Sequence, residues 1–467
     1  MLKPYRDLAP IELFFYWRTV DRYFSNFRVG AEYSQELDEE TVFKALNYMC
    51  YKYSSFAANV YDFGVKDKAG FTGKMQLMDK FRLEDVLTVI NDPQENCETQ
   101  IDKIHDYFFE YAGKEPLWKV VLINKKQLLF YCDHVPFDGN SAFNFHRVFG
   151  EALRIVNNTK TIDEYVGMES ILYDSSKISG DWFVQPSPFE ILDSTVPFKR
   201  YLYEVLLHSM PACISKYVRY YFGGNPNRKL MHYDARSLPP PGKDNCAWLH
   251  IPTEKLSKLL SKCRQNNVKL TSLLYLVGML ATKDFLGDYD NQLGCPFNMR
   301  DQIDKEKASL LCPNFHPEFG ALIGFNVMEF PSIFAVCPEG KINWDAVRSI
   351  HQMVHDGKSR SLESMNLFQV FDSREYLKEM YTPTREGGNS IPTMVISNLG
   401  NISIDNNSGD GLQVEKAWFD QPMDNTMIWM NVCSANQGLT ISLRTHLPEW
   451  LETYRTGVDE LLDSLLV

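Results

Sequence analysis

The sequence predicts an α/β (α+β) protein with two lobes, each a mixed sheet with helices packed on it. The chain has 467 residues, more than a single hydrophobic core normally holds. Segments with strand and helix patterns alternate in both halves, which is typical of sheets covered by helices. A stretch rich in proline and glycine over residues 223–245 separates the halves and favours an extended linker. We therefore expect one lobe over 1–222 and a second over 246–467.

The composition excludes several classes of protein. Apolar residues make up 44% and charged residues 23%, a balance that supports a large core. The net charge of −12 argues against a nucleic-acid-binding protein, which needs a basic face. Ten cysteines are spread singly with no Cys-x-x-Cys pair, and the N-terminal residues do not form a signal peptide. Apolar runs such as 273–281 are too short to span a bilayer. We therefore expect reduced thiols and a cytoplasmic monomer.

Hydrophobic periodicity predicts the elements of the first half. Residues 41–53 carry apolar side chains at helical spacing. Residues 118–123 and 127–133 are strand-like, and the short segment 124–126 between them predicts a hairpin. Residues 157–197 are polar and irregular, and residues 198–222 are helical and aromatic.

The second half repeats the pattern with more strands. A strand over 247–251 is followed by helices over 253–266 and 271–285. A last helix over 449–466 has one apolar face. Between these helices we predict six strands, over residues 293–299, 323–330, 393–397, 413–419, 427–433 and 439–445.

The most informative motif is His134-Val-Pro-Phe-Asp138-Gly139, which lies where the strand 127–133 ends and the helix 141–149 begins. It is the only His-x-x-x-Asp-Gly in the chain. A neutral histidine at a strand end can accept a proton near neutral pH. An aspartate followed by glycine predicts a tight turn in which the carboxylate folds back. The sequence therefore predicts His134 as a general base, with a core histidine as the alternative.

This stretch resembles the active-site motif of the CoA-dependent acyltransferase superfamily, which has the chloramphenicol-acetyltransferase-like fold. Residues 296–300 (Pro-Phe-Asn-Met-Arg), 395–400 (Val-Ile-Ser-Asn-Leu-Gly) and 268–276 resemble further segments of that fold. The Asp-Phe-Gly-Trp-Gly motif of plant BAHD enzymes is absent, and the double histidine of condensation domains is Asp133-His134 here. Among the branches, the chain is most similar to the yeast alcohol acetyltransferases and their relatives that N-acetylate lipophilic amines.

The resemblance implies two such lobes with a tunnel between them. It implies acetyl-CoA as co-substrate, no metal, and direct transfer of the acetyl group to a small lipophilic alcohol or amine, with His134 as the catalytic base. It also implies that Asp138 pairs with Arg300 and that Gly139 lets the backbone approach the substrate. Ser397 and Asn398 are the oxyanion candidates by their strand position, with a strand end leading into a turn as the alternative. The backbone N–H of Gly139 is a further candidate.

Two questions remain open at this stage. A non-catalytic member of the same fold that binds a ligand or partner is the alternative to an enzyme. The segment 198–222 is aromatic and carries four basic residues against one acid, which predicts contact with a membrane or lipophilic substrate. An ordinary packed helix pair is the alternative there. Peripheral attachment to the endoplasmic reticulum or to lipid droplets is therefore kept open beside the cytoplasm.

Overall fold

The computed structural model describes most of the chain. The described residues are 5–67, 70–156, 161–178, 183–193, 195–209, 245–313, 315–369, 372–381, 392–404, 412–424 and 426–466. The predicted linker 223–245 lies outside them, apart from Asn245. Within these ranges, no helix combines the length and apolar composition needed to cross a bilayer.

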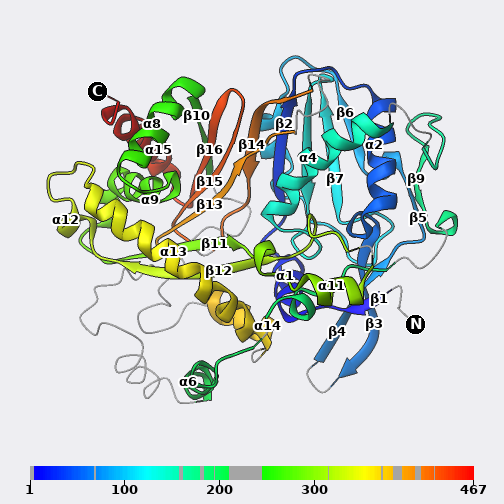
Figure 1. The fold of residues 1–467 in the computed structure, drawn as a ribbon, viewed down its shortest axis with the longest axis horizontal. Coiled ribbons are helices and arrows are strands. Elements are labelled where there is room, and N and C mark those ends of the chain that lie inside the picture. The colour runs from blue at the N-terminus through cyan, green and yellow to red at the C-terminus, as the bar shows by residue number, and fades with distance from the viewer. Residues whose placement is uncertain are drawn as a thin grey trace.

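A five-stranded sheet forms the core of the first half (Figure 1). The predicted hairpin is confirmed, because Trp118 pairs with Cys132 and Ile123 with Gln127. Asn124 at its tip has a φ of 49°, and the next residue also has a positive φ, as type I′ turns require. The strand order is β14 (Val414–Asp420), β2 (Phe27–Tyr33), β8 (Gln127–Cys132), β7 (Trp118–Ile123) and β6 (Leu87–Ile90).

Helices cover both faces of this sheet. The apolar runs of β7 and β8 place even-numbered side chains such as Phe130 in one core cluster and odd-numbered ones such as Leu129 in another. The first cluster is closed by α2 (Glu39–Lys52) and α4 (Gly139–Val156), and the second by α1 (Pro10–Val20) and α3 (Cys97–Lys103). The end of β8 is therefore enclosed between α4 and α1.

The second half forms a six-stranded sheet. Its order is β10 (Asn245–Pro252), β16 (Gly438–Thr445), β15 (Ile428–Ala435), β13 (Met394–Asn401), β11 (Asn291–Asn298) and β12 (Ile323–Phe330). Its core is closed by α8 (Thr253–Gln265), α9 (Leu270–Ala281), α13 (Trp344–Asn366) and α15 (Pro448–Ser464). Every strand that we predict for this half has a counterpart, whereas α13 was not predicted.

The two halves are joined through β14. This strand follows β13 in the chain but pairs with β2, so a strand of the range 246–467 completes the sheet of the range 1–222. Its last residue, Asp420, is fully buried and binds Arg28 at 2.5 Å and Arg444 at 2.7 Å. Because these two arginines come from the two sheets, the buried ion cluster ties the sheets together.

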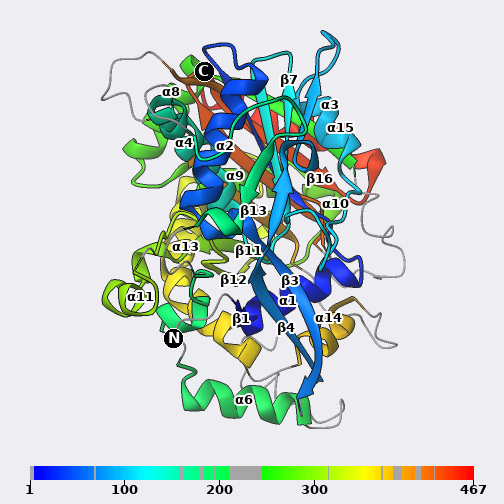
Figure 2. The same cartoon turned by 90° about the vertical axis from the view of Figure 1, so that its right-hand side faces the viewer.

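The remaining elements are small. Two short sheets contain β1 (Tyr5–Asp7), β4 (Gly70–Leu77) and β3 (Ala58–Asp67) in one, and β5 (Lys80–Arg82) and β9 (Ile171–Asp174) in the other. The short helices are α5 (Pro188–Ile191), α6 (Phe198–Ser209), α10 (Lys283–Leu286), α11 (Lys305–Leu311), α12 (Ile333–Val336) and α14 (Ser373–Tyr381). Figure 2 shows α1 and α14 close together, and Arg374 of α14 binds Asp21 just beyond α1 at 2.7 Å.

One buried histidine of α4 predicts acid sensitivity. His146 Nε2 lies 2.9 Å from the Val29 carbonyl, and its Nδ1 lies 2.9 Å from the Tyr33 hydroxyl. Burial lowers the pKa of His146 from 6.5 to about 4. The unfolded chain therefore binds this proton more readily, so its contribution to stability is complete above pH 6.5 and is lost as the pH falls towards 4.

We expect His146→Gln to lose less stability than the wild type between pH 7 and pH 4.5, by about 2–3 kcal/mol. Denaturant unfolding of both proteins at the two pH values measures the difference. Asp133, whose pKa is raised, acts in the opposite direction but is common to both proteins. Equal losses in the two proteins would contradict the assignment.

Candidate active site

The predicted strand–turn–helix around the motif is present. β8 ends at Cys132 and α4 begins at Gly139, so His134 and Asp138 lie in the connection between them. The helix begins two residues earlier than the sequence pattern indicates, because Asp138 caps it. The Ser141 backbone N–H donates to Asp138 Oδ1 at 2.7 Å, which satisfies one of the free donors of the first turn.

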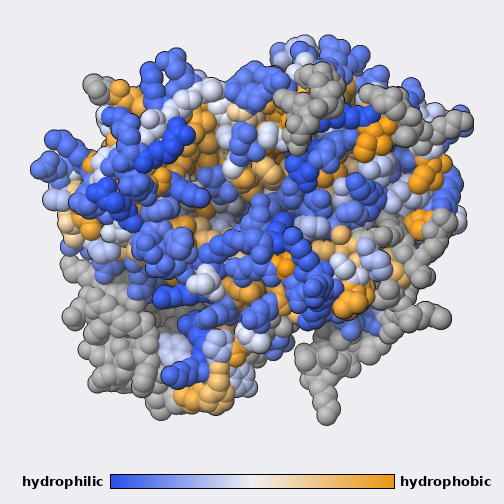
Figure 3. Space-filling model, viewed as in Figure 1, coloured by the Kyte–Doolittle hydropathy of each residue, from blue (hydrophilic) through white to orange (hydrophobic). Residues whose placement is uncertain are grey.

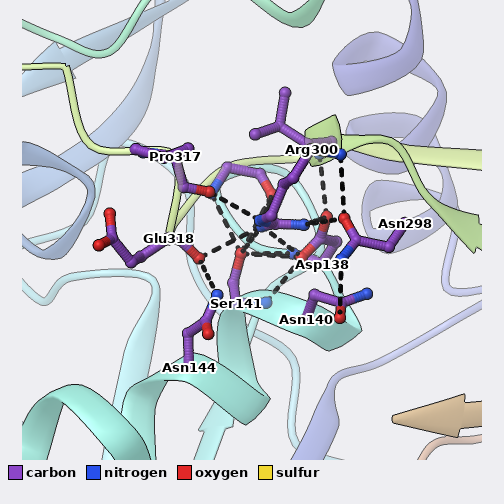
Figure 4. Close-up of polar contacts among 10 residues, drawn as sticks. Asp138, Asn140, Ser141, Asn144, Asn298, Arg300, Pro317 and Glu318 are labelled. Carbon is purple, nitrogen blue, oxygen red and sulfur yellow. Dashed lines mark hydrogen bonds and ion pairs between the residues drawn. The ribbon is translucent and has the colours of Figure 1, made fainter. Parts of the chain in front are cut away.

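Asp138 forms the predicted ion pair with Arg300 (Figure 4). Arg300 Nη1 and Nη2 donate to the two carboxylate oxygens at 2.8 and 2.9 Å, a bidentate arrangement. The Ser141 hydroxyl donates to Oδ1 at 2.9 Å and the Leu322 backbone N–H to Oδ2 at 3.0 Å. Asp138 is 1% exposed, so its charge is almost fully compensated inside the protein.

Arg300 is held at the same time by backbone carbonyl groups of the segment that leads into β12. Its Nε donates to the Pro317 carbonyl at 2.7 Å, and its Nη2 lies 3.3 Å from the carbonyls of Glu318 and Gly320. Figure 4 shows the guanidinium enclosed between this segment and the start of α4. Because Arg300 follows β11 and Asp138 precedes α4, the pair connects the two halves 162 residues apart in sequence.

His134 lies on the α1 side of the motif, enclosed by aromatic rings. Its imidazole stacks on Phe15 with 3.8 Å between centroids, and Phe27 and Phe24 lie at 4.9 and 5.9 Å. The residue is 8% exposed, and its Nδ1 is buried without a hydrogen-bond partner among the described residues. Burial, assisted by the positive charge of Arg18, lowers the pKa of His134 to about 3. The imidazole is therefore neutral near pH 7, the form that accepts a proton.

Asp133, next to His134, anchors α1 to the end of β8. Its carboxylate accepts hydrogen bonds from the Thr19 and Tyr111 hydroxyls at 3.0 Å and from the Val135 backbone N–H at 2.9 Å. Burial raises the pKa of Asp133 to about 6. The sequence offered no role for Asp133, because Thr19 and Tyr111 are remote along the chain.

Sequence reasoning also missed Phe15 and Arg18 of α1. Arg18 is 9% exposed, and its guanidinium carbon lies 4.1 Å from the Phe24 ring centroid. Arginine in a helix is usually solvated, so no local pattern marks Arg18 as buried. The one available signal is the aromatic density of residues 14–17, Phe-Phe-Tyr-Trp.

β13 places Ser397 and Asn398 on opposite faces, and Leu399 of the same strand reaches the motif. Leu399 contacts the start of α4, since a Cβ on Gly139 would lie 3.0 Å from Leu399 Cδ2. Leu399 is the extra residue of a bulge between Asn398 and Gly400, so alternation along the strand places Ser397 on the face opposite Asn398 but does not place it relative to Leu399. Asn398 lies on the other face, where it donates to the Thr271 hydroxyl at 3.0 Å and accepts from the Gly400 backbone N–H at 2.9 Å. Both polar atoms of Asn398 thus stabilise the end of the strand.

A small hollow of about 20 Å³ adjoins the motif loop. Pro136 of the motif lines it, together with Met75 and Ser55 of the first half and Phe319 and Leu322 of the second. In the part of the chain that is described, no group of three His, Cys, Asp or Glu side chains could hold a metal ion.

Comparison with known proteins assigns the family. The sequence model of the alcohol acetyltransferase family matches residues 8–465. The N-acetyltransferase SLI1 of Saccharomyces cerevisiae is 23% identical over 420 residues, which cover 84% of each chain.

Solved structures show the same fold at low sequence identity. The TRI3 trichothecene 15-O-acetyltransferase of Fusarium sporotrichioides superposes with a TM-score of 0.67 at 11% identity, covering 99% of this chain and 95% of that one. The first condensation domain of the CDA synthetase gives a TM-score of 0.60 at 11% identity, covering 98% and 96%. The mixed sheets and packed helices are thus those of the two-lobed chloramphenicol-acetyltransferase-like proteins. The chain belongs to the alcohol acetyltransferase family and is an acyltransferase.

Proposed function

We propose that this protein transfers the acetyl group of acetyl-CoA to a small lipophilic alcohol or amine, with His134 as the general base. The observation that carries the proposal is a buried imidazole just after a strand end, with an Nδ1 that has no hydrogen-bond partner among the described residues, next to an Asp138–Arg300 pair that spans the two halves. The aromatic surroundings of His134 favour an apolar acceptor. The alcohol acetyltransferase family and the yeast relative called an N-acetyltransferase support the two acceptor classes.

In the proposed reaction, His134 takes the proton from the acceptor hydroxyl or amine as this group attacks the thioester carbon. The oxygen of the thioester then carries negative charge and needs fixed donors. We propose that the Ser397 hydroxyl and the Gly139 backbone N–H donate hydrogen bonds to this oxygen from the side of β13. Asn398, the other donor suggested by the sequence, is less suitable because its amide is engaged with Thr271.

The test is a thioester assay with acetyl-CoA and a panel of alcohols and amines, in which released CoA and acetylated product are measured separately. We expect equal amounts of both products with at least one acceptor class. CoA release without an acetylated product would indicate hydrolysis. A protein that binds acetyl-CoA but shows no turnover with any acceptor would favour the non-catalytic alternative.

We further propose that α6 contacts an anionic membrane surface. Phe198 is 74% exposed, and Tyr201, Leu202 and Leu206 at helical spacing are also exposed. Lys199 and Arg200 lie beside them, also exposed. Figure 3 shows apolar residues over α6, at the lower edge of the molecule. Basic residues beside an exposed apolar stripe suit an anionic lipid surface. Residues 210–222, the rest of the segment that we predict to contact a membrane or lipophilic substrate, lie outside the described residues.

Flotation with liposomes tests this proposal. We expect binding to vesicles containing phosphatidylserine and not to phosphatidylcholine alone, and a fall of about tenfold or more for Lys199→Glu/Arg200→Glu. Lys305→Glu/Lys307→Glu on exposed positions of α11 is the matched control and should bind like the wild type. Equal binding of both double variants to the phosphatidylserine vesicles would contradict the proposal that α6 contacts the membrane.

A further inference from the structure

Arg18 is a buried cation beside the proposed base. Its guanidinium carbon lies 4.1 Å from the ring centroid of Phe24 and 5.8 Å from that of Phe15. The ring centroid of His134 lies 3.8 Å from that of Phe15 and 5.9 Å from that of Phe24. The two polar groups therefore rest against the same two rings. The Thr19–Asp133 hydrogen bond of 3.0 Å fixes the helix residue next to Arg18 to the residue next to His134.

The hydrogen bonding of Arg18 is incomplete. Its Nε is buried without a hydrogen-bond partner among the described residues. The nearby carboxylate of Asp133 is already bound by two hydroxyls and a backbone N–H. The aromatic rings attract the guanidinium but do not accept the N–H bond of Nε, and a buried donor without an acceptor is costly. A cationic donor is thus available beside the base.

We propose that Arg18 is a further catalytic residue, whose guanidinium donates to the oxyanion that forms on the thioester carbonyl. This proposal rests on the function proposed above. The acceptor proton moves to His134, the acceptor atom bonds to the carbonyl carbon, and the carbonyl π electrons move to the oxygen. On collapse the carbon–sulfur bond breaks, and the CoA thiolate takes the proton back from His134. A fixed positive donor in an enclosed site is a strong means of stabilising such an oxygen.

The same arrangement explains how His134 can accept a proton although the cation Arg18 lies beside it. In the resting protein burial, assisted by the positive charge of Arg18, keeps His134 neutral, and Asp138 acts against it. As the oxyanion develops it offsets that charge, so the imidazole gains proton affinity at the moment it receives the proton. The other titratable groups around the site are Asp133 on the adjacent position, Tyr111, and Tyr381 of α14, whose hydroxyl interacts with Arg18.

Arg18→Ala should lower kcat about 10²–10³-fold and leave the KM for acetyl-CoA nearly unchanged. Guanidinium at low, non-denaturing concentration should restore at least part of kcat, whereas urea, which has a similar shape and no charge, should not. Arg374→Met is the matched control: this arginine of α14 also lies 4.1 Å from a ring of α1, that of Trp17, but is paired with Asp21. Its kcat should equal that of the wild type.

A second pair of variants covers the case in which Arg18→Ala does not fold. Arg18→Lys keeps the charge and Arg18→Met keeps only the length, so the lysine variant should retain kcat at least about tenfold above the methionine variant. Equal kcat in these two, a wild-type kcat in Arg18→Ala, or a loss that guanidinium does not restore overturns the role of Arg18. If the wild type transfers acetyl groups and depends on His134, such a result removes only this inference. A wild type without transferase activity removes the proposed function itself.

Discussion

Replacing His134 by alanine is expected to lower kcat about 10²–10⁴-fold, the usual contribution of a positioned general base. The physical reason is that the neutral imidazole is the proton acceptor of the proposed reaction. Binding of acetyl-CoA should change little. The measurement is kcat with acetyl-CoA beside a binding isotherm, with His355→Ala as the control, because His355 is an exposed histidine of α13.

The structure also predicts an effect of His134→Ala on stability. A base at a tunnel wall would contribute little packing, but His134 is stacked on Phe15 and enclosed by two further rings. His134→Ala should therefore also lose about 1–3 kcal/mol of stability through the cavity that it leaves. Melting curves separate this loss from the catalytic effect. A folded His134→Ala protein that keeps most of its kcat would remove the mechanism.

Asp138→Ala is expected to lower the free energy of unfolding by about 3–5 kcal/mol and to lower activity as well. It leaves Arg300 without its carboxylate and α4 without its cap, and the loop that carries His134 loses its anchor. Denaturant unfolding and kcat are the two measurements. Arg147→Ala is the control on the same helix, since its pairs with Glu151 and Glu318 are partly exposed and are each worth at most about 1 kcal/mol.

Asp138→Asn should recover part of that stability. Its amide oxygen can take the place of Oδ1 and accept from Ser141 and Arg300. Its NH₂ group would face two donors at Oδ2, Arg300 Nη1 and the Leu322 N–H, so recovery is incomplete. If the asparagine variant is as unstable as the alanine variant, the charge of Asp138 matters more than its role as cap. Wild-type stability in Asp138→Ala would show that the ion pair is dispensable.

The long helix α13 shows why part of the fold could not be predicted. Its buried face includes Gly357 and Ser361 beside apolar residues, so apolar side chains mark only part of that face. These small residues are needed because α13 approaches β12 closely: a Cβ on Gly357 would lie 2.8 Å from the Asn326 amide nitrogen. Such close packing is visible only when helix and sheet are placed together. The strands of the second sheet were predictable because their apolar runs carry the signal themselves.

The same difference between local patterns and long-range packing applies to the active site. The sequence by itself determined the strand, turn and helix around His134 and Asp138, because capping, turn formation and apolar periodicity act over a few neighbouring residues. The partner Arg300 was assigned through a family resemblance, and the structure confirms the contact. Only the tertiary structure decided that Phe15 and Arg18 of α1 surround His134 and that Asn398 turns towards Thr271. Those contacts depend on how sheets and helices pack across more than a hundred residues of chain, and no local pattern encodes them.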